Sequence, residues 1–406
     1  MNRLISVNLS DVSPESLPPR RREGPVRVLF LNCNILGLRT VAMHLKHHCE
    51  SHDGIDAVHI DLAAPLWMKI LGKQVPVWTA GWDFHRWRHM RMWSPIIRRW
   101  VRGPLSLDHF DVVQVMTQNQ VPGVLGEFPR DDVRLVIKID ATAVQDVVDF
   151  GLSATAFAPI IAGERKMYPL ADLVVADTRW ACRSVRDDFG IPEGRIHRAT
   201  NGVNIPSFSR QDEEFQGRDG PVRIAFVGNA WRRKGGDLLL HAHQTRLRDR
   251  SELHVMGKIK PADRFAKNVI WHGLVPREKL LNEMLPQMDI FVLPSRIDML
   301  PFSSVEAAAT GLPIVVPRLA GYPEMVHDGE TGLLFDRGDE KSLGDALERL
   351  VDDPPLRDRL GRAVRKLVSE EFDSNRVYPQ WIDRLVALAD DPARAHDVSA
   401  WTPPCN

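Results

Sequence analysis

The chain has 406 residues, of which 44% are hydrophobic and 26% charged, as in an ordinary globular protein large enough for two domains. Its 53 basic and 53 acidic residues give a formal net charge of zero, which excludes a general attraction to nucleic acid or to membranes. The four scattered cysteines have no metal-binding or redox spacing and suit a reducing compartment. No apolar run of signal-peptide or transmembrane type is present, so we expect a cytoplasmic protein, unless it docks on a membrane face.

The first half of the chain predicts a leader followed by a Rossmann-like domain. Residues 1–24 are polar and proline-rich, and we expect them to be flexible. The run VRVLFL at 26–31 predicts a buried strand, and TVAMHLKHH at 40–48 predicts a helix after it. More strands are predicted at 56–62, 110–116 and 134–140. We therefore place a doubly wound domain at residues 25–204.

Two candidate site residues lie at strand ends of this domain. Gly37, in the loop after the first strand, would let backbone approach a phosphate, although an ordinary turn glycine is the alternative. Asp140 follows an apolar strand and would position a sugar hydroxyl or an acceptor. The alternative is that the segment ATAVQD at 141–146 caps a helix. His44 and His48 are four residues apart on a helix without a third ligand, so we expect a polar helix face and no metal.

Residues 82–102 mix tryptophans with arginines. Ser94-Pro95 predicts the start of a short helix. One face of this helix would be apolar and the other basic, formed respectively by Ile96, Ile97, Trp100 and Val101 and by Arg98, Arg99 and Arg102. Three interpretations stay open: docking on an anionic membrane or a lipid-linked acceptor, base stacking, and a helix packed on its own domain with a solvated basic face. We expect no nucleic-acid partner.

A second domain is predicted at residues 205–375, after a polar linker at 204–220. Its first strand, VRIAFVG at 222–228, runs into a basic loop, and Gly235-Gly236 lead into a helix. Helix N-termini and loop cations bind anions, so this segment fits a nucleotide diphosphate. It matches neither the GxGxxG nor the Walker pattern. The candidate residues of the loop are Gly228, Asn229, Arg232, Arg233 and Lys234.

The stretch from Met288 to Phe335 is the most informative part of the sequence. An apolar strand is followed by Asp298, and Glu306 opens a helical segment of small residues. A second strand and the turn Gly321-Tyr322-Pro323-Glu324 come next. In such parallel βαβ units, ligands lie beyond the carboxyl ends of the strands. Two acids at that place would accept hydrogen bonds from a polyhydroxylated ligand.

The C-terminal segment predicts helices near 339–352 and 355–370. A further helix is expected at 376–390, and a disordered tail at 391–406.

The stretch with the two acids resembles the donor-sugar site of retaining GT-B glycosyltransferases, in particular the large fourth family. Its pattern is Glu, seven residues, Glu, then Gly-x-Pro and Gly-x-Pro-Glu. Here Asp298 and Glu306 have that spacing and precede Gly311-Leu312-Pro313 and the Gly321–Glu324 turn. Lys234-Gly235 also matches the family, whereas Asn229 stands in place of an arginine. The resemblance implies an α/β protein of GT-B fold: two Rossmann-like doubly wound domains that face each other across a cleft, with residues 376–390 crossing back to the first.

The resemblance also implies an activity, namely transfer of a hexose-type sugar from a nucleoside-diphosphate sugar to a hydroxyl of a glycan, lipid-linked or small-molecule acceptor, with retention. Glu306 would bind the ribose and Asp298 the donor sugar, and Lys234 with an arginine would stabilise the leaving diphosphate. The backbone at Leu300, Pro301, Phe302 and Ser303 would hold the sugar or diphosphate. Without an Asp-x-Asp motif at a strand end, we expect neither metal nor cofactor. The alternatives are a GT-B sugar-nucleotide epimerase and a degenerate binding protein, which Asp298 and Asn229 would favour.

Overall fold

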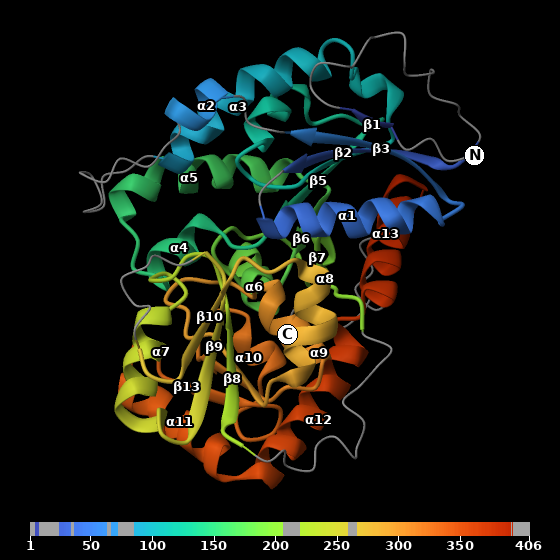
Figure 1. Cartoon of the computed structure of the whole chain (residues 1–406). Helices are drawn as coiled ribbons and strands as arrows, with labels where there is room; N and C mark the ends of the chain where they lie inside the picture. The colour runs from blue at the N-terminus through green and yellow to red at the C-terminus, as the bar shows by residue number, and fades with distance from the viewer. Residues whose placement is uncertain are drawn as a thin grey trace. The chain divides into compact units, whose positions relative to one another are not determined.

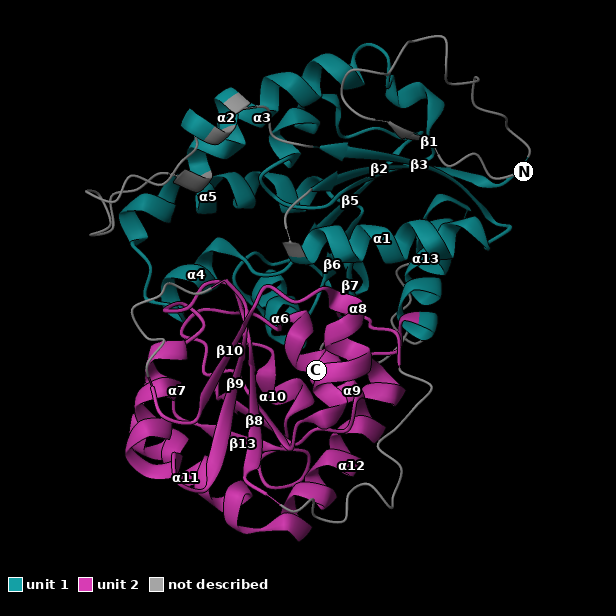
Figure 2. Cartoon of the chain, viewed as in Figure 1, with its two compact units in different colours: residues 1–200, 375–406 teal, residues 201–374 magenta. Residues whose placement is uncertain are grey.

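The computed structural model describes residues 5–7, 24–33, 36–62, 66–71, 85–205, 220–258, 266–390 and 392 (Figure 1). The chain divides into two compact units, Met1–Thr200 with Asn375–Asn406 and Asn201–Ser374, which Figure 2 colours separately. The second unit begins at Asn201 and not at 205, because Val203 exchanges backbone hydrogen bonds with Phe372 and Ser374 at 2.8 and 2.9 Å. Most of the predicted linker and tail lies outside the described residues.

The first unit is built on a seven-stranded sheet of order β1-β3-β2-β4-β5-β6-β7, in which all neighbouring strands are parallel. The strands are β1 Ile5–Val7, β2 Val26–Cys33, β3 Ile55–Leu62, β4 Val112–Val115, β5 Arg134–Ile139, β6 Leu173–Ala176 and β7 Ile196–Arg198. Every residue of β2 is buried, as expected for a parallel strand covered on both faces. The strand order reverses direction between β2 and β4, so the carboxyl ends of these strands form a switch point.

Two predictions for the start of the chain need correction. Within the leader, Ile5–Val7 is an edge strand that pairs in parallel with β3, with Ile5 opposite Val58. The first helix begins at Leu36, so Gly37 lies in its first turn and not in a loop. The helices of this unit are α1 Leu36–Glu50, α2 Leu66–Leu71, α3 His85–Val101, α4 Ala143–Val148, α5 Ala154–Met167, α6 Arg179–Asp187 and α13 Ser374–Asp390.

Helix α3 begins at His85, not at Ser94-Pro95, and Pro95 lies inside it. Met90, Trp93, Ile97 and Val101 recur three or four residues apart and are buried, so they form the face that packs on the core. Ile97 also lies against Gly123, where an added Cβ would come within 2.5 Å of the Ile97 Cβ. Half of the predicted apolar stripe is therefore inside the domain, and Ile96 and Trp100 pack partly against the same core.

Helix α13 belongs to the first unit and packs on its sheet. The Trp381 indole N–H donates to Oε1 of Gln114, in the middle of β4, at 3.0 Å. Arg384 is buried, approaches Nδ1 of His197 at 3.0 Å and donates to the Gly194 carbonyl at 2.9 Å. Because both contacts satisfy polar groups away from water, the helix is fixed in one position on the sheet.

The second unit contains a six-stranded parallel sheet of order β10-β9-β8-β11-β12-β13. Its strands are β8 Val222–Val227, β9 Ser251–Met256, β10 Val269–Gly273, β11 Ile290–Val292, β12 Ile314–Pro317 and β13 Leu333–Phe335. Its α-helices are α7 Gly236–Ala242, α8 Arg277–Lys279, α9 Phe302–Ala309, α10 Tyr322–Met325, α11 Glu340–Asp352 and α12 Pro354–Glu371. The order reverses between β8 and β11, so the loops after these two strands are neighbours.

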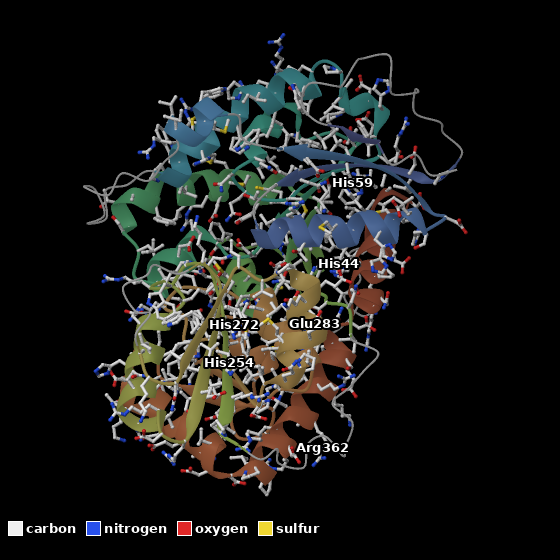
Figure 3. All side chains as sticks on the ribbon, viewed as in Figure 1. His44, His59, His254, His272, Glu283 and Arg362 are labelled. Atoms are coloured by element: carbon white, nitrogen blue, oxygen red, sulfur yellow. The ribbon has the colours of Figure 1, made fainter. Side chains whose placement is uncertain are left out.

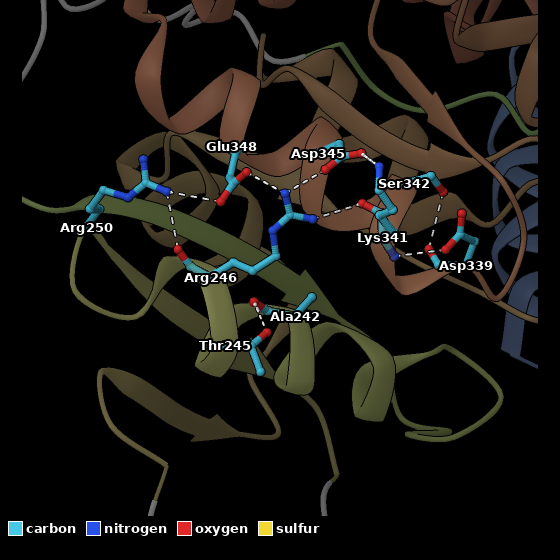
Figure 4. A network of polar contacts seen from close by, with 9 residues as sticks. All are labelled: Ala242, Thr245, Arg246, Arg250, Asp339, Lys341, Ser342, Asp345 and Glu348. Carbon is cyan, nitrogen blue, oxygen red and sulfur yellow. Dashed lines mark hydrogen bonds and ion pairs between the residues drawn. The ribbon is translucent and has the colours of Figure 1, made fainter.

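A surface ion network ties α11 to the helical segment after β8. Arg246, in the π-helical turn His243–Leu247 that continues α7, contacts Asp345 at 2.6 Å and Glu348 at 2.5 Å (Figure 4). Arg250 contacts Glu348 at 3.3 Å. Single exposed pairs stabilise little, but a network holds two helices in a fixed relation. In the described part of the chain, no helix has both the length and the apolar character needed to cross a bilayer.

Candidate active site

The loop after β8 is shaped by two glycines. Gly235 adopts a left-handed conformation with φ of 72°, and an added Cβ would lie 1.8 Å from the carbonyl oxygen of Pro294. At Gly236 an added Cβ would lie 2.1 Å from the Trp231 ring. The loop is closed by backbone hydrogen bonds from Lys234 to Ala230 at 2.8 Å and from Gly235 to Arg232 at 3.1 Å. Only glycine fits these two places, and the resulting turn directs the Lys234 side chain towards the loop after β11.

The loop after β11 carries Asp298, whose carboxylate meets Lys234. The Lys234 Nζ lies 2.6 Å from Oδ2 of Asp298, and the Ser295 hydroxyl donates to the same oxygen at 2.8 Å. Arg233 Nη1 lies 3.3 Å from Oδ1 and also donates to the Ile297 carbonyl at 2.7 Å. The two residues predicted to act on the donor are therefore in direct contact in this structure.

Burial governs the electrostatics of this contact. Lys234 and Asp298 are each only 8% exposed. Burial lowers the pKa of Lys234 from its ordinary value, and the ion pair with Asp298 opposes that shift. Water screens such a pair poorly, so the cation is held in place before any ligand arrives.

Glu306 lies on α9, at the carboxyl side of β11, and is 7% exposed. Burial raises its pKa, and the guanidinium of Arg277 opposes that rise. Arg277 Nε donates to Oε1 of Glu306 at 2.8 Å, and its Nη2 contacts the same oxygen. Sequence reasoning missed Arg277, although a basic residue just beyond the carboxyl end of the strand at 269–273 was a usable signal.

The segment from Leu300 to Ser303 is held from two sides. The Asn201 amide donates to the Leu300 carbonyl at 2.8 Å, and the Gly321 N–H donates to the Met299 carbonyl at 3.0 Å. Pro301 is the residue before α9, and Phe302 and Ser303 form the first turn of that helix, half-buried. Asn201 was not predicted, because its sequence context reads only as a turn. The backbone predicted to hold the donor is thus fixed by two hydrogen bonds.

The other predicted residues of the β8 loop differ in what they contact. Asn229 accepts a hydrogen bond from the Lys258 backbone at 3.0 Å, so it anchors the loop after β9. Gly228 donates its N–H to Met256 at 2.9 Å. The Arg232 side chain is exposed and makes no hydrogen bond or ion pair with the described residues, in contrast to Arg233. The geometry therefore brings Arg233, and not Arg232, to Asp298.

In the first unit, Asp140 follows β5 directly and is partly exposed. The helix after it is capped by Thr142, whose hydroxyl accepts from the Gln145 N–H, so Asp140 is not the cap. Its carboxylate makes no hydrogen bond or ion pair among residues 85–205, where the structure is continuous. The helix cap that was the alternative for this segment is thus present, on Thr142, and contact of Asp140 with a ligand stays a prediction. Gly37, in α1, is exposed.

Beside Asp140 lies a buried acid that the sequence did not single out. Both oxygens of Glu164, on α5, accept from the Ala143 N–H, at 2.9 and 3.1 Å, and Gln118 donates at 3.3 Å. Burial raises the pKa of Glu164 to about 8, against the effect of these hydrogen bonds. Its contacts fix the start of α4 against α5, and with it the backbone that follows Asp140.

The prediction of a polar face for the histidines of α1 is wrong, because His44 and His48 form a buried stack. The rings of His44 and His48 lie 5.0 and 5.7 Å from that of Tyr378 on α13, and both histidines are 8% exposed. Across the described ranges, no group of three or more His, Cys, Asp and Glu side chains is arranged to hold a metal ion. Figure 3 shows His44 on α1, together with the pair His254 and His272 in the second unit.

Solved structures of similar fold identify the architecture as GT-B. Sucrose-phosphate synthase from Thermosynechococcus elongatus superposes with a TM-score of 0.70 at 15% identity, over 89% of this chain and 99% of that chain. HepE of Anabaena, in complex with UDP and glucose, gives a TM-score of 0.66 at 15% identity, over 89% and 100%. The predicted α/β fold with two doubly wound sheets is therefore confirmed.

The second unit resembles known glycosyltransferases. Residues 221–353 match the family model of glycosyl transferases group 1, the family that the two acids and Lys234 indicated. D-inositol 3-phosphate glycosyltransferase of Corynebacterium diphtheriae is 32% identical over 254 residues, 57% of this chain and 58% of that protein. The enzyme of the same name from Paenarthrobacter aurescens is 27% identical over 219 residues, 49% of this chain and 54% of that protein. These matches thus span little more than half the length of each relative.

Proposed function

We propose that this protein is a glycosyltransferase that moves a sugar from a nucleoside-diphosphate sugar to an acceptor hydroxyl, with retention of the anomeric configuration. The observation that carries the proposal is the cluster of Lys234, Arg233 and Asp298 at the switch point of the second sheet, with Glu306 on the following helix. Ligands of open α/β sheets bind at such a switch point. HepE, which has a similar fold, was solved with UDP-glucose and supports a nucleotide sugar as donor.

The chemistry asks for cations near the diphosphate. When the sugar–phosphate bond breaks, negative charge builds up on the leaving diphosphate, and preorganised donors that face this charge lower the barrier. Lys234 and Arg233 are such donors, since both are already held by Asp298. We propose that they stabilise the leaving group without a metal ion, and that the leaving phosphate accepts the proton of the acceptor hydroxyl, so that no protein nucleophile is needed.

The remaining residues would position the donor. Glu306 would accept hydrogen bonds from the ribose hydroxyls, while Asp298 would contact the sugar after the diphosphate has taken over Lys234. The fixed backbone of Leu300 to Ser303 would hold the sugar or the diphosphate. Asp140, whose carboxylate has no hydrogen-bond or ion-pair partner among the described residues of the first unit, would position the acceptor or a sugar hydroxyl.

Incubation with a panel of nucleotide sugars tests the proposal. Transfer to an acceptor, or slow hydrolysis of the donor, is the expected result. Epimerisation of the donor without any acceptor would show the alternative enzyme, and binding without turnover would show the degenerate binding protein. A thermal-shift screen with UDP, GDP, ADP and dTDP selects the nucleotide first, because a ligand at 100 times its dissociation constant stabilises by about 2.7 kcal/mol.

We also propose that the first unit contacts an anionic membrane, which would suit a lipid-linked acceptor and a cytoplasmic enzyme. Helix α2 exposes Trp67, Ile70 and Leu71, although an apolar side chain is ordinarily buried. Helix α3 exposes Arg98 and Arg99. The two helices contribute to one hydrophobic core, through Met68 and Trp93 among others. Exposed apolar and basic residues together are the signature of an interfacial surface. The apolar part of this membrane surface would then come from α2, and not from the apolar face predicted for α3.

A further inference from the structure

The contact between Arg277 and Glu306 is one-sided. Both guanidinium contacts, from Nε and from Nη2, go to Oε1. In the part of the chain that the structure describes, no side chain or backbone group donates to Oε2. The side chain of Glu306 is 8% exposed, whereas that of Arg277 is 44% exposed. The carboxylate is therefore buried, and the guanidinium that contacts it is partly in solvent.

We propose that Arg277 is a positioning residue for ribose recognition: it fixes the Glu306 carboxylate by one oxygen and leaves the other oxygen to accept a ribose hydroxyl. The inference rests on the proposed function, because it deepens the role of Glu306 in binding the donor nucleotide. A carboxylate on a helix can rotate about its terminal torsions, and two N–H contacts to one oxygen remove that freedom before the ligand binds.

The surroundings make Arg277 the cation on which Glu306 depends. Burial raises the pKa of Glu306, and Arg277 is the charged group that lowers it. Helix α12 packs on α9, but its Arg365 donates to the Ala309 carbonyl, at the far end of the helix. Strand β12, also beside α9, has no ionisable side chain, and Asp298 is engaged with Lys234. Loss of Arg277 would therefore raise the pKa of Glu306 further, and the acid would become protonated at a higher pH.

The local backbone explains how Arg277 reaches this place. Strand β10 ends at Gly273, which has a left-handed φ of 69°, and the chain then turns through Pro276 into the short helix α8. Arg277 is the first residue of that helix, so its side chain starts beside the carboxyl end of β10. Lys279 lies on the same short helix, is exposed, and makes no contact with Glu306, which makes it a matched control.

The experiment compares wild type with Arg277→Met, Arg277→Lys and the control Lys279→Met. Calorimetry measures the dissociation constant of whichever of UDP, GDP and ADP binds best, and of its 2′,3′-dideoxy analogue, between pH 5.5 and 8.5. Wild type is expected to prefer the ribonucleotide at every pH. Below the raised pKa, the ionised fraction of Glu306 falls about tenfold per pH unit, so Arg277→Met should lose affinity and ribose preference as pH falls. Arg277→Lys should restore the pH profile but only part of the ribose preference, because lysine lacks the planar fork.

The outcomes separate this inference from the proposed function. If wild type binds none of the nucleotides, the proposed function fails. If wild type binds a nucleotide but does not distinguish ribose from dideoxyribose, or if Arg277→Met keeps the wild-type preference and pH profile, only the role of Arg277 and Glu306 is overturned. Tighter nucleotide binding by Arg277→Met would show that Arg277 competes with the ribose, and it would also overturn the inference. Melting curves of the two Arg277 variants, measured beside wild type and the control Lys279→Met, show whether the fold of each variant is intact.

Discussion

Replacing Lys234 by alanine should slow the chemical step far more than it weakens binding of the nucleotide. The Nζ of Lys234 lies 2.6 Å from Asp298, on a loop that two glycines hold in one conformation. The diphosphate carries charge before the reaction, but it gains more as the sugar leaves. The lysine therefore interacts more strongly with the transition state than with the bound donor, which is the condition for an effect on kcat.

The size of the effect follows from the burial of the lysine. Two unit charges about 4 Å apart interact by about 4 kcal/mol at an effective dielectric constant of about 20. Removal of one preorganised donor to a developing anion typically costs about 2.7–4 kcal/mol, or about 10²–10³ in rate. Because Asp298 already shares the charge of Lys234, we expect the lower end, about 100-fold in kcat. Arg233 remains, so nucleotide affinity should change by less than about tenfold, which is about 1.4 kcal/mol.

The assay follows release of nucleoside diphosphate from a saturating nucleotide sugar, and calorimetry follows nucleotide affinity. Lys267→Ala is the control, since it removes a lysine that pairs with Asp249 on the surface of the same unit. Lys234→Met is measured alongside, because it keeps most of the side chain's length. Turnover near that of wild type in either Lys234 variant, with a normal melting temperature, would refute the reasoning.

Further predictions address the other groups of the site and the membrane surface. Glu306→Gln should weaken nucleoside-diphosphate binding by about 1.5–3 kcal/mol per charged hydrogen bond lost, and unchanged affinity in calorimetry would contradict the ribose assignment. Asp298→Ala should lower turnover without weakening nucleotide affinity; the opposite pattern would exchange the roles of the two acids. Enzyme treated with EDTA should remain active, and loss of activity that Mg²⁺ or Mn²⁺ restores would show a metal-dependent reaction. Co-sedimentation with phosphatidylglycerol vesicles should fall with rising salt and in the variant Arg98→Glu/Arg99→Glu, at about 1 kcal/mol per basic residue; equal pelleting of the variant would count against the surface.

The sequence was sufficient for the elements whose signals are local. The apolar runs that became β2 and β11 were readable because parallel strands buried on both faces are almost continuously hydrophobic. The start of α3 was misplaced, because Ser94-Pro95 is a strong local signal for a helix start. The burial of Met90 against the core, which extends the helix backwards, depends on a tertiary contact.

The site shows the same division. Asp298, Glu306 and Lys234 were found from their spacing, but their partners were not. Arg277 comes from another strand end, 29 positions before Glu306, and Asn201 is 99 positions from Leu300. No local pattern indicates such pairs, since only the order of strands in the sheet brings them together. The same is true of the choice between Arg232 and Arg233, which are adjacent in the sequence but differ in direction.

The charges of the site in its present state suggest how a donor would enter it. Lys234, Arg233 and Arg277 carry three positive charges, against two negative charges on Asp298 and Glu306, so the side chains leave one net positive charge. Each acid is thus paired, and neither is buried alone, which would be strongly destabilising. A diphosphate brings more negative charge than this excess, so it can be accommodated only if Lys234 and Arg233 turn part of their interaction from Asp298 to the phosphates. In the proposed reaction, Asp298 would then contact the donor sugar. The same exchange would limit the ground-state affinity of the donor, because the two cations give up part of their interaction with Asp298.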